Sequence, residues 1–191
     1  GYSEKETAMR RIKDIVQGQG MMEAISYSLT SPEKAISFTK DPKPVVEVQW
    51  PLNSSRSTMR ENLLTGLVDA ASYNMARKQK ELALFEQGRV YDHENNTFNE
   101  HEHLAALYSG HTVSANWQHL DQKIDFYFVK GQLTNLFRAI GIKDTDIEYR
   151  PEIIVGMHPT RTAGIYLNDQ YVGLIGMIAH TVTTLDKALR G

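Results

Sequence analysis

The stretch Leu84-Phe85-Glu86-Gln87-Gly88-Arg89-Val90-Tyr91 decides the fold class, because it has the pattern of a β-strand. Side chains alternate between the two faces of a strand, so every second residue, Glu86 included, lies on one mostly apolar face. We predict a strand over residues 82–92. An unpaired charge on such a face is costly, so Glu86 needs a partner. The candidates are Arg60 and Arg89, and the residues alone leave structural pairing and ligand binding equally open.

Amphipathic helices are expected on both sides of this strand, because apolar residues recur there at helical spacing. The predicted helices are one from an N-cap at Ser3 to Gly18, a short one opened by Ser31-Pro32-Glu33, and three over residues 63–75, 126–140 and 181–189. Ser3 and Glu6 form a capping box at the start of the first helix. Gly141 is placed to end the helix over 126–140.

Further strands follow from alternating or short apolar runs. They are predicted over residues 22–29, 45–50, 104–108, 162–167 and 171–178, with a hairpin turn at Asn168-Asp169-Gln170. Residues 51–60 are expected to be a loop, and residues 92–102 a polar segment with a turn at Asn95-Asn96. Strands mostly follow one another without an intervening helix. This order predicts an α+β fold with an antiparallel sheet flanked by helices, gathered on one side, in a single domain over 1–191.

Composition narrows the class of protein. The 191 residues are 41% hydrophobic and 23% charged with a net charge of −2, which is ordinary for a globular domain and gives no broad positive face for nucleic acid. There is no cysteine, so disulfides and thiolate metal sites are excluded. No apolar run approaches membrane-spanning length, so no membrane association is expected, and a cytoplasmic protein is compatible. The chain begins at Gly1 without a signal peptide, and we interpret it as a piece of a longer protein.

Two motifs for nucleotide or metal binding are weak. Gly18-Gln19-Gly20 stands at a helix end, whereas a phosphate loop needs N–H groups at a helix start, so C-capping explains these glycines. His101 and His103 would point the same way on a strand, but zinc sites usually need three ligands in fixed geometry. We therefore expect no metal site and no cofactor site in the chain.

His158-Pro159-Thr160-Arg161 is a stronger candidate site. A His-Pro bend that leads to an arginine just before a strand could hold a carboxylate or phosphate, because the guanidinium binds such groups in a bidentate fork. The alternative is that His158 and Arg161 only organise the loop by hydrogen bonds.

Several segments, in their order along the chain, together resemble the core domain of the beta subunit of bacterial phenylalanyl-tRNA synthetase. They are residues 10–30, Pro51-Leu52-Asn53-Ser54, Met59-Arg60, residues 63–67 and 84–91, Trp117, residues 125–131, residues 158–163 and Gly173-Leu174-Ile175-Gly176. No single piece is specific, whereas their ordered combination is.

The resemblance implies a class II aminoacyl-tRNA synthetase-like fold in an (αβ)2 enzyme that joins phenylalanine to its tRNA with ATP and magnesium. It implies that the alpha subunit holds the active site, and that this core packs against alpha beside a second beta subunit. It also implies that the opening helix and strand resemble the class II motif that builds subunit interfaces. Because Arg89 has no adjoining Arg-x-Glu loop and no later motif 3 arginine is found, we expect no catalytic residue here.

Departures from the family pattern occur at Phe128-Val129 and at His180-Thr181. The leading hypothesis is a non-catalytic interaction core. An alternative is a vestigial amino-acid or adenylate binding module that uses Arg60, Glu86, His158 and Arg161, and an active synthetase is the least favoured reading. Contacts with tRNA are a further hypothesis, based on a set of basic residues on predicted helices. The alternative is that these residues only form solvated helix faces. These basic residues are Arg10, Arg11, Lys13, Arg77, Lys78 and Lys80.

Overall fold

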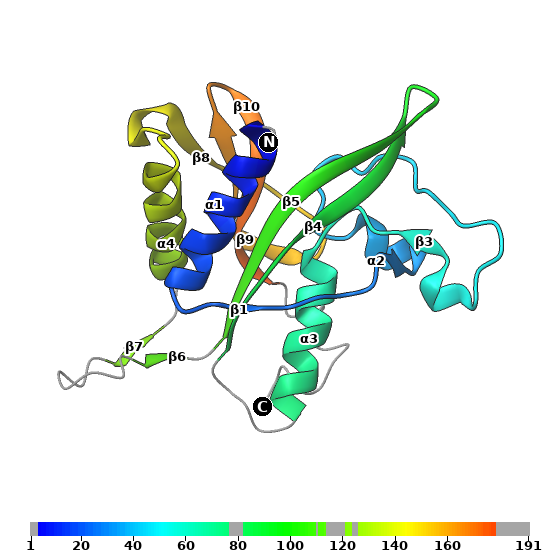
Figure 1. Cartoon of the computed structure of the whole chain (residues 1–191), viewed down its shortest axis with the longest axis horizontal. Coiled ribbons are helices and arrows are strands. Elements are labelled where there is room, and N and C mark those ends of the chain that lie inside the picture. Colours follow the sequence, from blue (N-terminus) through cyan, green and yellow to red (C-terminus); the bar gives the residue numbers. More distant parts are fainter. Residues whose placement is uncertain (1–3, 77–81, 110, 114–120, 124–125, 179–191) are drawn as a thin grey trace.

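Two three-stranded sheets and the helices around them make up the fold (Figure 1). The structure is a computed structural model that describes residues 4–76, 82–109, 111–113, 121–123 and 126–178. One sheet has the order β1-β4-β5, built from β1 (Met22–Glu23), β4 (Leu82–Glu94) and β5 (Thr97–Ser109). The other has the order β10-β9-β8, built from β8 (Ile147–Pro151), β9 (Met157–Leu167) and β10 (Gln170–Ile178).

The remaining elements are four α-helices, two 3-10 turns and four short strands within the described ranges. They are α1 (Glu4–Gly18), α2 (Pro32–Ile36), α3 (Leu64–Ala76), α4 (Phe126–Ala139), η1 (Ser54–Arg56), η2 (Asp144–Asp146), β2 (Leu29–Thr30), β3 (Thr58–Met59), β6 (His111–Val113) and β7 (Asp121–Lys123). The α+β class with mainly antiparallel pairing is confirmed, and the exception is β1, which pairs with β4 in parallel.

Helices cover both faces of β4, which corrects the expectation that they gather on one side. Leu84 packs with Leu67 and Ala71 of α3, whereas the fully buried Phe85 packs with α1 and α4. Neighbouring residues of a strand face opposite ways, so these two contacts lie on opposite faces. Glu86 therefore shares the α3 face with Leu84.

The β4–β5 hairpin is longer than predicted. Its register runs unbroken from Leu82↔Ser109 to Glu94↔Thr97, so the strands predicted over 82–92 and 104–108 are too short, and most of the polar segment over 92–102 is strand. The turn at Asn95-Asn96 is confirmed, with φ of 54° and 60°. The outer half of the hairpin extends away from the body, as Figure 1 shows, and most of its residues from Asp92 to His101 are polar.

Other boundaries also need correction. The strand predicted over 22–29 is two short strands separated by an irregular segment, and the strand predicted over 45–50 is a single bridge between Glu47 and Thr58. The strand β8 was not predicted. The helices α1 to α4 and the β9–β10 hairpin are confirmed, whereas the helix predicted over 181–189 lies outside the described residues.

Candidate functional site

Of the two predicted candidates, Arg60 and Arg89, it is Arg60 that pairs with Glu86. Arg60 lies just after β3, and its Nη1 is 3.2 Å from Glu86 Oε1, with only 10% and 5% of the two side chains exposed. Arg60 Nε also donates to the carbonyl oxygen of Arg89 at 2.8 Å. The guanidinium is thereby held by two groups of β4, the Glu86 carboxylate and the Arg89 carbonyl oxygen. Structural pairing is present here, while ligand binding by the pair stays a prediction.

Ser26 completes this buried cluster. Its backbone N–H donates to Glu86 Oε1 at 2.9 Å, and its hydroxyl lies 3.0 Å from Oε1 and 2.7 Å from Oε2. Arg60 Nη1 donates to the same hydroxyl at 3.2 Å. The role of Ser26 was not predictable from the sequence, because a serine between two apolar residues gives no signal of a buried partner 60 residues away.

Two glycines let the cluster close. An added Cβ at Gly66 would stand 2.3 Å from Ser26 Oγ and 2.7 Å from its Cβ, and one at Gly88 would stand 2.7 Å from Arg60 Nη2. Gly66 belongs to α3 and Gly88 to β4. The helix and the strand therefore approach the charged pair at positions where no side chain intervenes.

His158 and Arg161 lie elsewhere. Both are within β9, in the other sheet, so the predicted His-Pro bend before a strand is wrong. His158 Nδ1 accepts from the backbone N–H of Thr160 at 3.1 Å, and Arg161 Nη1 donates to the sulfur of Met177 at 3.5 Å. These contacts are local, as in the alternative that the two side chains only organise their own segment. That segment is a strand and not a loop. The structure brings Arg60 and Glu86 together, whereas His158 and Arg161 lie in the other sheet and do not join them.

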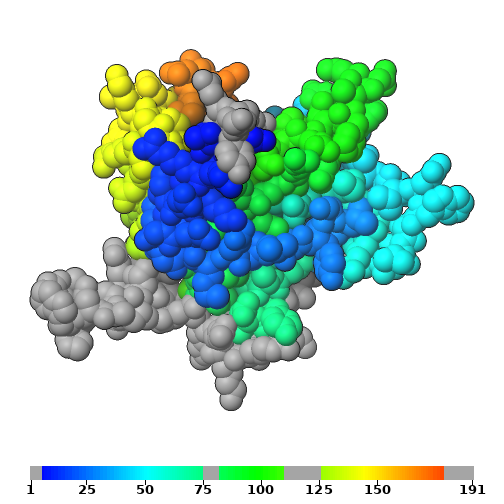
Figure 2. All heavy atoms as spheres, viewed as in Figure 1, coloured from blue at the N-terminus to red at the C-terminus, as the bar shows by residue number. Residues whose placement is uncertain are grey.

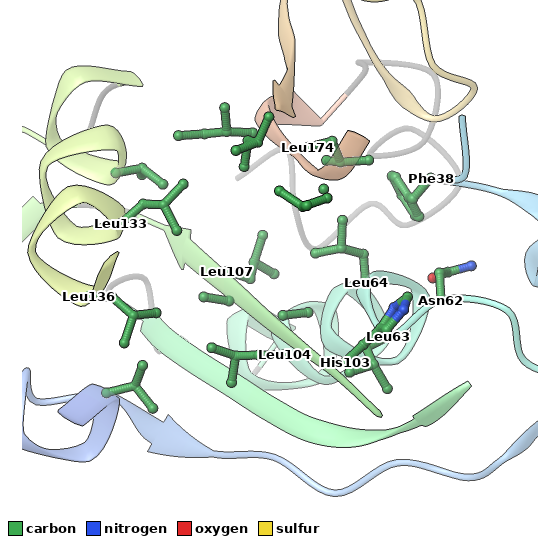
Figure 3. Close-up of a pocket in the computed structure, with 18 of the residues that line it drawn as sticks. Phe38, Asn62, Leu63, Leu64, His103, Leu104, Leu107, Leu133, Leu136 and Leu174 are labelled. Atoms are coloured by element: carbon green, nitrogen blue, oxygen red, sulfur yellow. The ribbon is translucent and has the colours of Figure 1, made fainter. Parts of the chain in front are cut away.

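A cavity of about 610 Å³ lies between the two sheets (Figure 3). Leucines of several elements reach into it, among them Leu104 and Leu107 from β5, Leu133 and Leu136 from α4, and Leu174 from β10. The wall is mostly apolar, as in many small-molecule sites.

Glu61 also lines this cavity, although nothing in the sequence pattern indicates it. Its side chain is buried, and its Oε2 has no hydrogen-bond partner among the described residues. Burial is the main cause that raises the pKa of Glu61 to about 7. The charge of Asp92 adds to this effect, while the backbone N–H and the charge of Lys43 oppose it. Near neutral pH this carboxyl is therefore divided between its charged and neutral forms.

The pair His101 and His103 lies on one face of β5, as predicted, with ring centroids 6.3 Å apart. His101 Nε2 lies 3.1 Å from Asp92 Oδ2. Within the described ranges, no group of three His, Asp or Glu side chains is arranged to hold a metal ion. The residues present in this part of the chain therefore do not favour a zinc site.

The cations near β4 are engaged with carboxylates. Arg89, in β4, pairs with Glu100 at 3.3 Å and with Glu102 at 3.1 Å. On α1, Lys13 pairs with Glu23 at 2.9 Å. The basic residues Arg77, Lys78 and Lys80 lie outside the described residues.

In the described part of the chain, no helix is long and apolar enough to cross a membrane.

Comparison with known proteins identifies the relatives of the chain. The family model for the phenylalanyl tRNA synthetase beta chain CLM domain matches residues 1–185. The chain is 92% identical over 191 residues to the phenylalanine–tRNA ligase beta subunit of Lactobacillus johnsonii, and 75% identical to that of Lactobacillus acidophilus. It covers 24% of the length of each of these relatives.

Solved structures show the fold alone, because their sequences are distant. A pyrrolysyl tRNA synthetase from Desulfitobacterium hafniense aligns over 97% of this chain and 62% of its own, with a TM-score of 0.66 and 14% identity. A histidine–tRNA ligase subunit from Alicyclobacillus acidocaldarius aligns over 78% of this chain and 41% of its own, with a TM-score of 0.54 and 14% identity. The predicted class II synthetase-like fold is thereby confirmed.

Proposed function

The chain belongs to the phenylalanyl-tRNA synthetase beta-chain family, and from this premise we propose that it is a non-catalytic core that docks the alpha subunit of the ligase. The chain spans about a quarter of its relatives' length, so the whole enzyme's reaction enters only as part of this proposal. In this proposal, the alpha subunit forms phenylalanyl-tRNA from phenylalanine, ATP and tRNA, with magnesium, within an (αβ)2 assembly.

The engaged arginines support the absence of chemistry in this core. Stabilising the charge that develops on a transferred adenylate requires cationic groups aimed at the reacting phosphate. Arg60 is buried against Glu86, and Arg89 is divided between two glutamates on β5. Both guanidiniums already have carboxylate partners, so neither is placed to bind a phosphate without first losing an ion pair.

An exposed apolar surface carries the proposal. We define the docking surface as five residues from the segment around β1 and from the loop before η1. They are Met22, Ile25, Tyr27, Trp50 and Leu52, with exposed fractions of 68%, 89%, 69%, 89% and 85%. The guanidinium of Arg56, in η1, stacks on the ring of Tyr27 at 3.9 Å, so the first segment contacts the turn that directly follows the second.

These two segments lie on the face shown in Figure 2, in blue and in cyan. Large apolar side chains gathered on a surface mark an interaction site, and Trp, Tyr and Arg carry much of the energy at interfaces. The partner to which we assign this surface is the alpha subunit, because the relatives are described as beta subunits of a ligase.

Substitution in the docking surface tests the proposal. We expect Tyr27→Ala and Trp50→Ala each to weaken alpha binding by about tenfold or more, as for buried aromatic residues at interfaces. Affinity is measured by titrating labelled alpha with the intact protein that contains this chain.

Tyr127→Ala is the matched control. Tyr127 is 78% exposed, but it lies on α4 and outside the docking surface, so its removal should leave the affinity unchanged. Equal affinity of the wild type and both docking-surface variants would contradict the assignment of this surface.

The second candidate is the vestigial amino-acid or adenylate binding module. One observation favours it, namely the apolar cavity with the buried Glu61 carboxyl in its wall. The pocket proposed from sequence, formed by Arg60, Glu86, His158 and Arg161, is divided between two sheets. Calorimetric titration with phenylalanine and with ATP tests whether the chain is a binding module. An absence of heat at millimolar ligand would contradict this second candidate.

A further inference from the structure

We infer that Glu86, together with Arg60, is a positioning pair that holds residues 24–28 in the conformation that alpha recognises. The inference rests on the proposed function, and it assigns to these two residues a role in docking in place of ligand binding. The buried ion pair thus acts on the partner through Ile25 and Tyr27, the two neighbours of Ser26.

Alternate residues of this segment are tied to the body of the protein. Ala24 N–H donates to the carbonyl oxygen of Phe85 at 2.7 Å, Ser26 N–H to Glu86 Oε1 at 2.9 Å, and the carbonyl oxygen of Ser28 accepts from Arg60 N–H at 2.9 Å. The residues between them, Ile25 and Tyr27, are 89% and 69% exposed. Three inward anchors two residues apart therefore direct the two apolar side chains outward.

The middle anchor is the one that backbone pairing does not supply. The segment belongs to neither β1 nor β2, so Ser26 has no strand neighbour there, and the Glu86 carboxylate accepts its N–H instead. A carboxylate can accept several hydrogen bonds at once, and here it accepts from the Ser26 amide, the Ser26 hydroxyl and Arg60.

Stability alone is a weak reason for a buried ion pair at this place. Desolvation offsets much of the attraction between buried charges, and apolar pairs of similar volume are often as stable. What an apolar pair cannot do is bind the N–H and hydroxyl of Ser26 and so fix the backbone between Ile25 and Tyr27. The chemistry of the pair therefore matches a positioning role.

α3 confines the anchor from the opposite side. A Cβ at Gly66 would overlap both Ser26 Oγ and Ser26 Cβ, and would stand 3.6 Å from Glu86 Oε2. Gly131 in α4 has no atom within 4 Å of the same added Cβ. Gly66→Ala should therefore displace Ser26, whereas Gly131→Ala is a control with the same change in helix propensity.

A double-mutant cycle on the intact protein tests the inference. Glu86→Gln should weaken alpha binding by about tenfold, and this loss should be clearly smaller when Tyr27 is already alanine, because only Ile25 is then left to be positioned. With Trp50→Ala, which removes a contact outside the anchored segment, the two losses should multiply. If Glu86→Gln weakened binding only by destabilising the fold, its loss of affinity would multiply with that of Tyr27→Ala as well as with that of Trp50→Ala.

Two milder variants make the test independent of whether Glu86→Gln folds. Ser26→Ala removes only the hydroxyl, and Gly66→Ala leaves every charge in place, yet both should weaken alpha binding and speed hydrogen exchange at residue 26. Gly131→Ala should do neither. Unchanged affinity in Ser26→Ala and Gly66→Ala would overturn the inference, as would Glu86→Gln losses that multiply with Tyr27→Ala. If Tyr27→Ala and Trp50→Ala themselves have no effect, the proposed docking surface fails instead.

Discussion

At the scale of single residues, two buried glutamates differ in what surrounds them. Glu86 accepts from Ser26 and Arg60, whereas Glu61 keeps one oxygen without a partner among the described residues. The need of Glu86 for a partner was predictable, because a charge on an apolar strand face must be paired. The burial of Glu61 was not predictable, because this residue lies between the loop predicted over 51–60 and the helix predicted over 63–75, where no pattern indicates which side chains are buried.

Glu61 predicts how stability changes with pH. Its pKa rises from 4.5 to about 7 on folding, so the folded state holds the proton more tightly. The resulting penalty is absent below pH 4.5, grows as the pH rises, and is complete above pH 7. We expect Glu61→Gln to stabilise the protein by about 1–3 kcal/mol at pH 8 and by little at pH 4.

Urea unfolding at both pH values measures this difference. The control is Glu33→Gln, because Glu33 is exposed on α2 and should give the same small effect at each pH. A Glu61→Gln effect that does not change between the two pH values would contradict burial as the cause of the raised pKa.

At the scale of elements, the helices were predictable and several strands were not. The stripe along α1, α3 and α4 repeats at the helical period because one side of each packs on a sheet. The alternation over 22–29 was read as one continuous strand, but it arises because Ile25 and Tyr27 face outward between anchored neighbours. The outer hairpin is mostly polar, and β8 is only five residues long with two apolar core residues, Ile147 and Tyr149, so pattern alone gave too short a signal for them.

The hairpin turn predicts opposite effects for two substitutions at one position. Asn96 has a φ of 60°, in the left-handed region that glycine adopts most easily. Asn96→Gly should stabilise the hairpin by a few tenths to about 1 kcal/mol, and Asn96→Val should destabilise it by more. Thermal unfolding of both variants measures the effects, and equal shifts of the two melting temperatures would be evidence against this turn.

At the scale of the whole molecule, a synthetase fold is combined with engaged arginines and an exposed apolar surface. The fold class followed from the order of the elements, and the family from an ordered set of individually weak motifs. The split of the sheet into two, and the cavity between them, depend on how distant segments pack, which no local pattern reports. The single domain over 1–191 remains a prediction.

Pyrophosphate exchange with phenylalanine and ATP is the measurement that tests the central claim most directly. It is made on the chain alone and on the intact protein assembled with alpha. A non-catalytic docking core predicts no exchange from the chain alone and exchange from the assembly. Exchange by the chain alone, abolished by Arg89→Ala, would contradict the account and make this domain a working synthetase core.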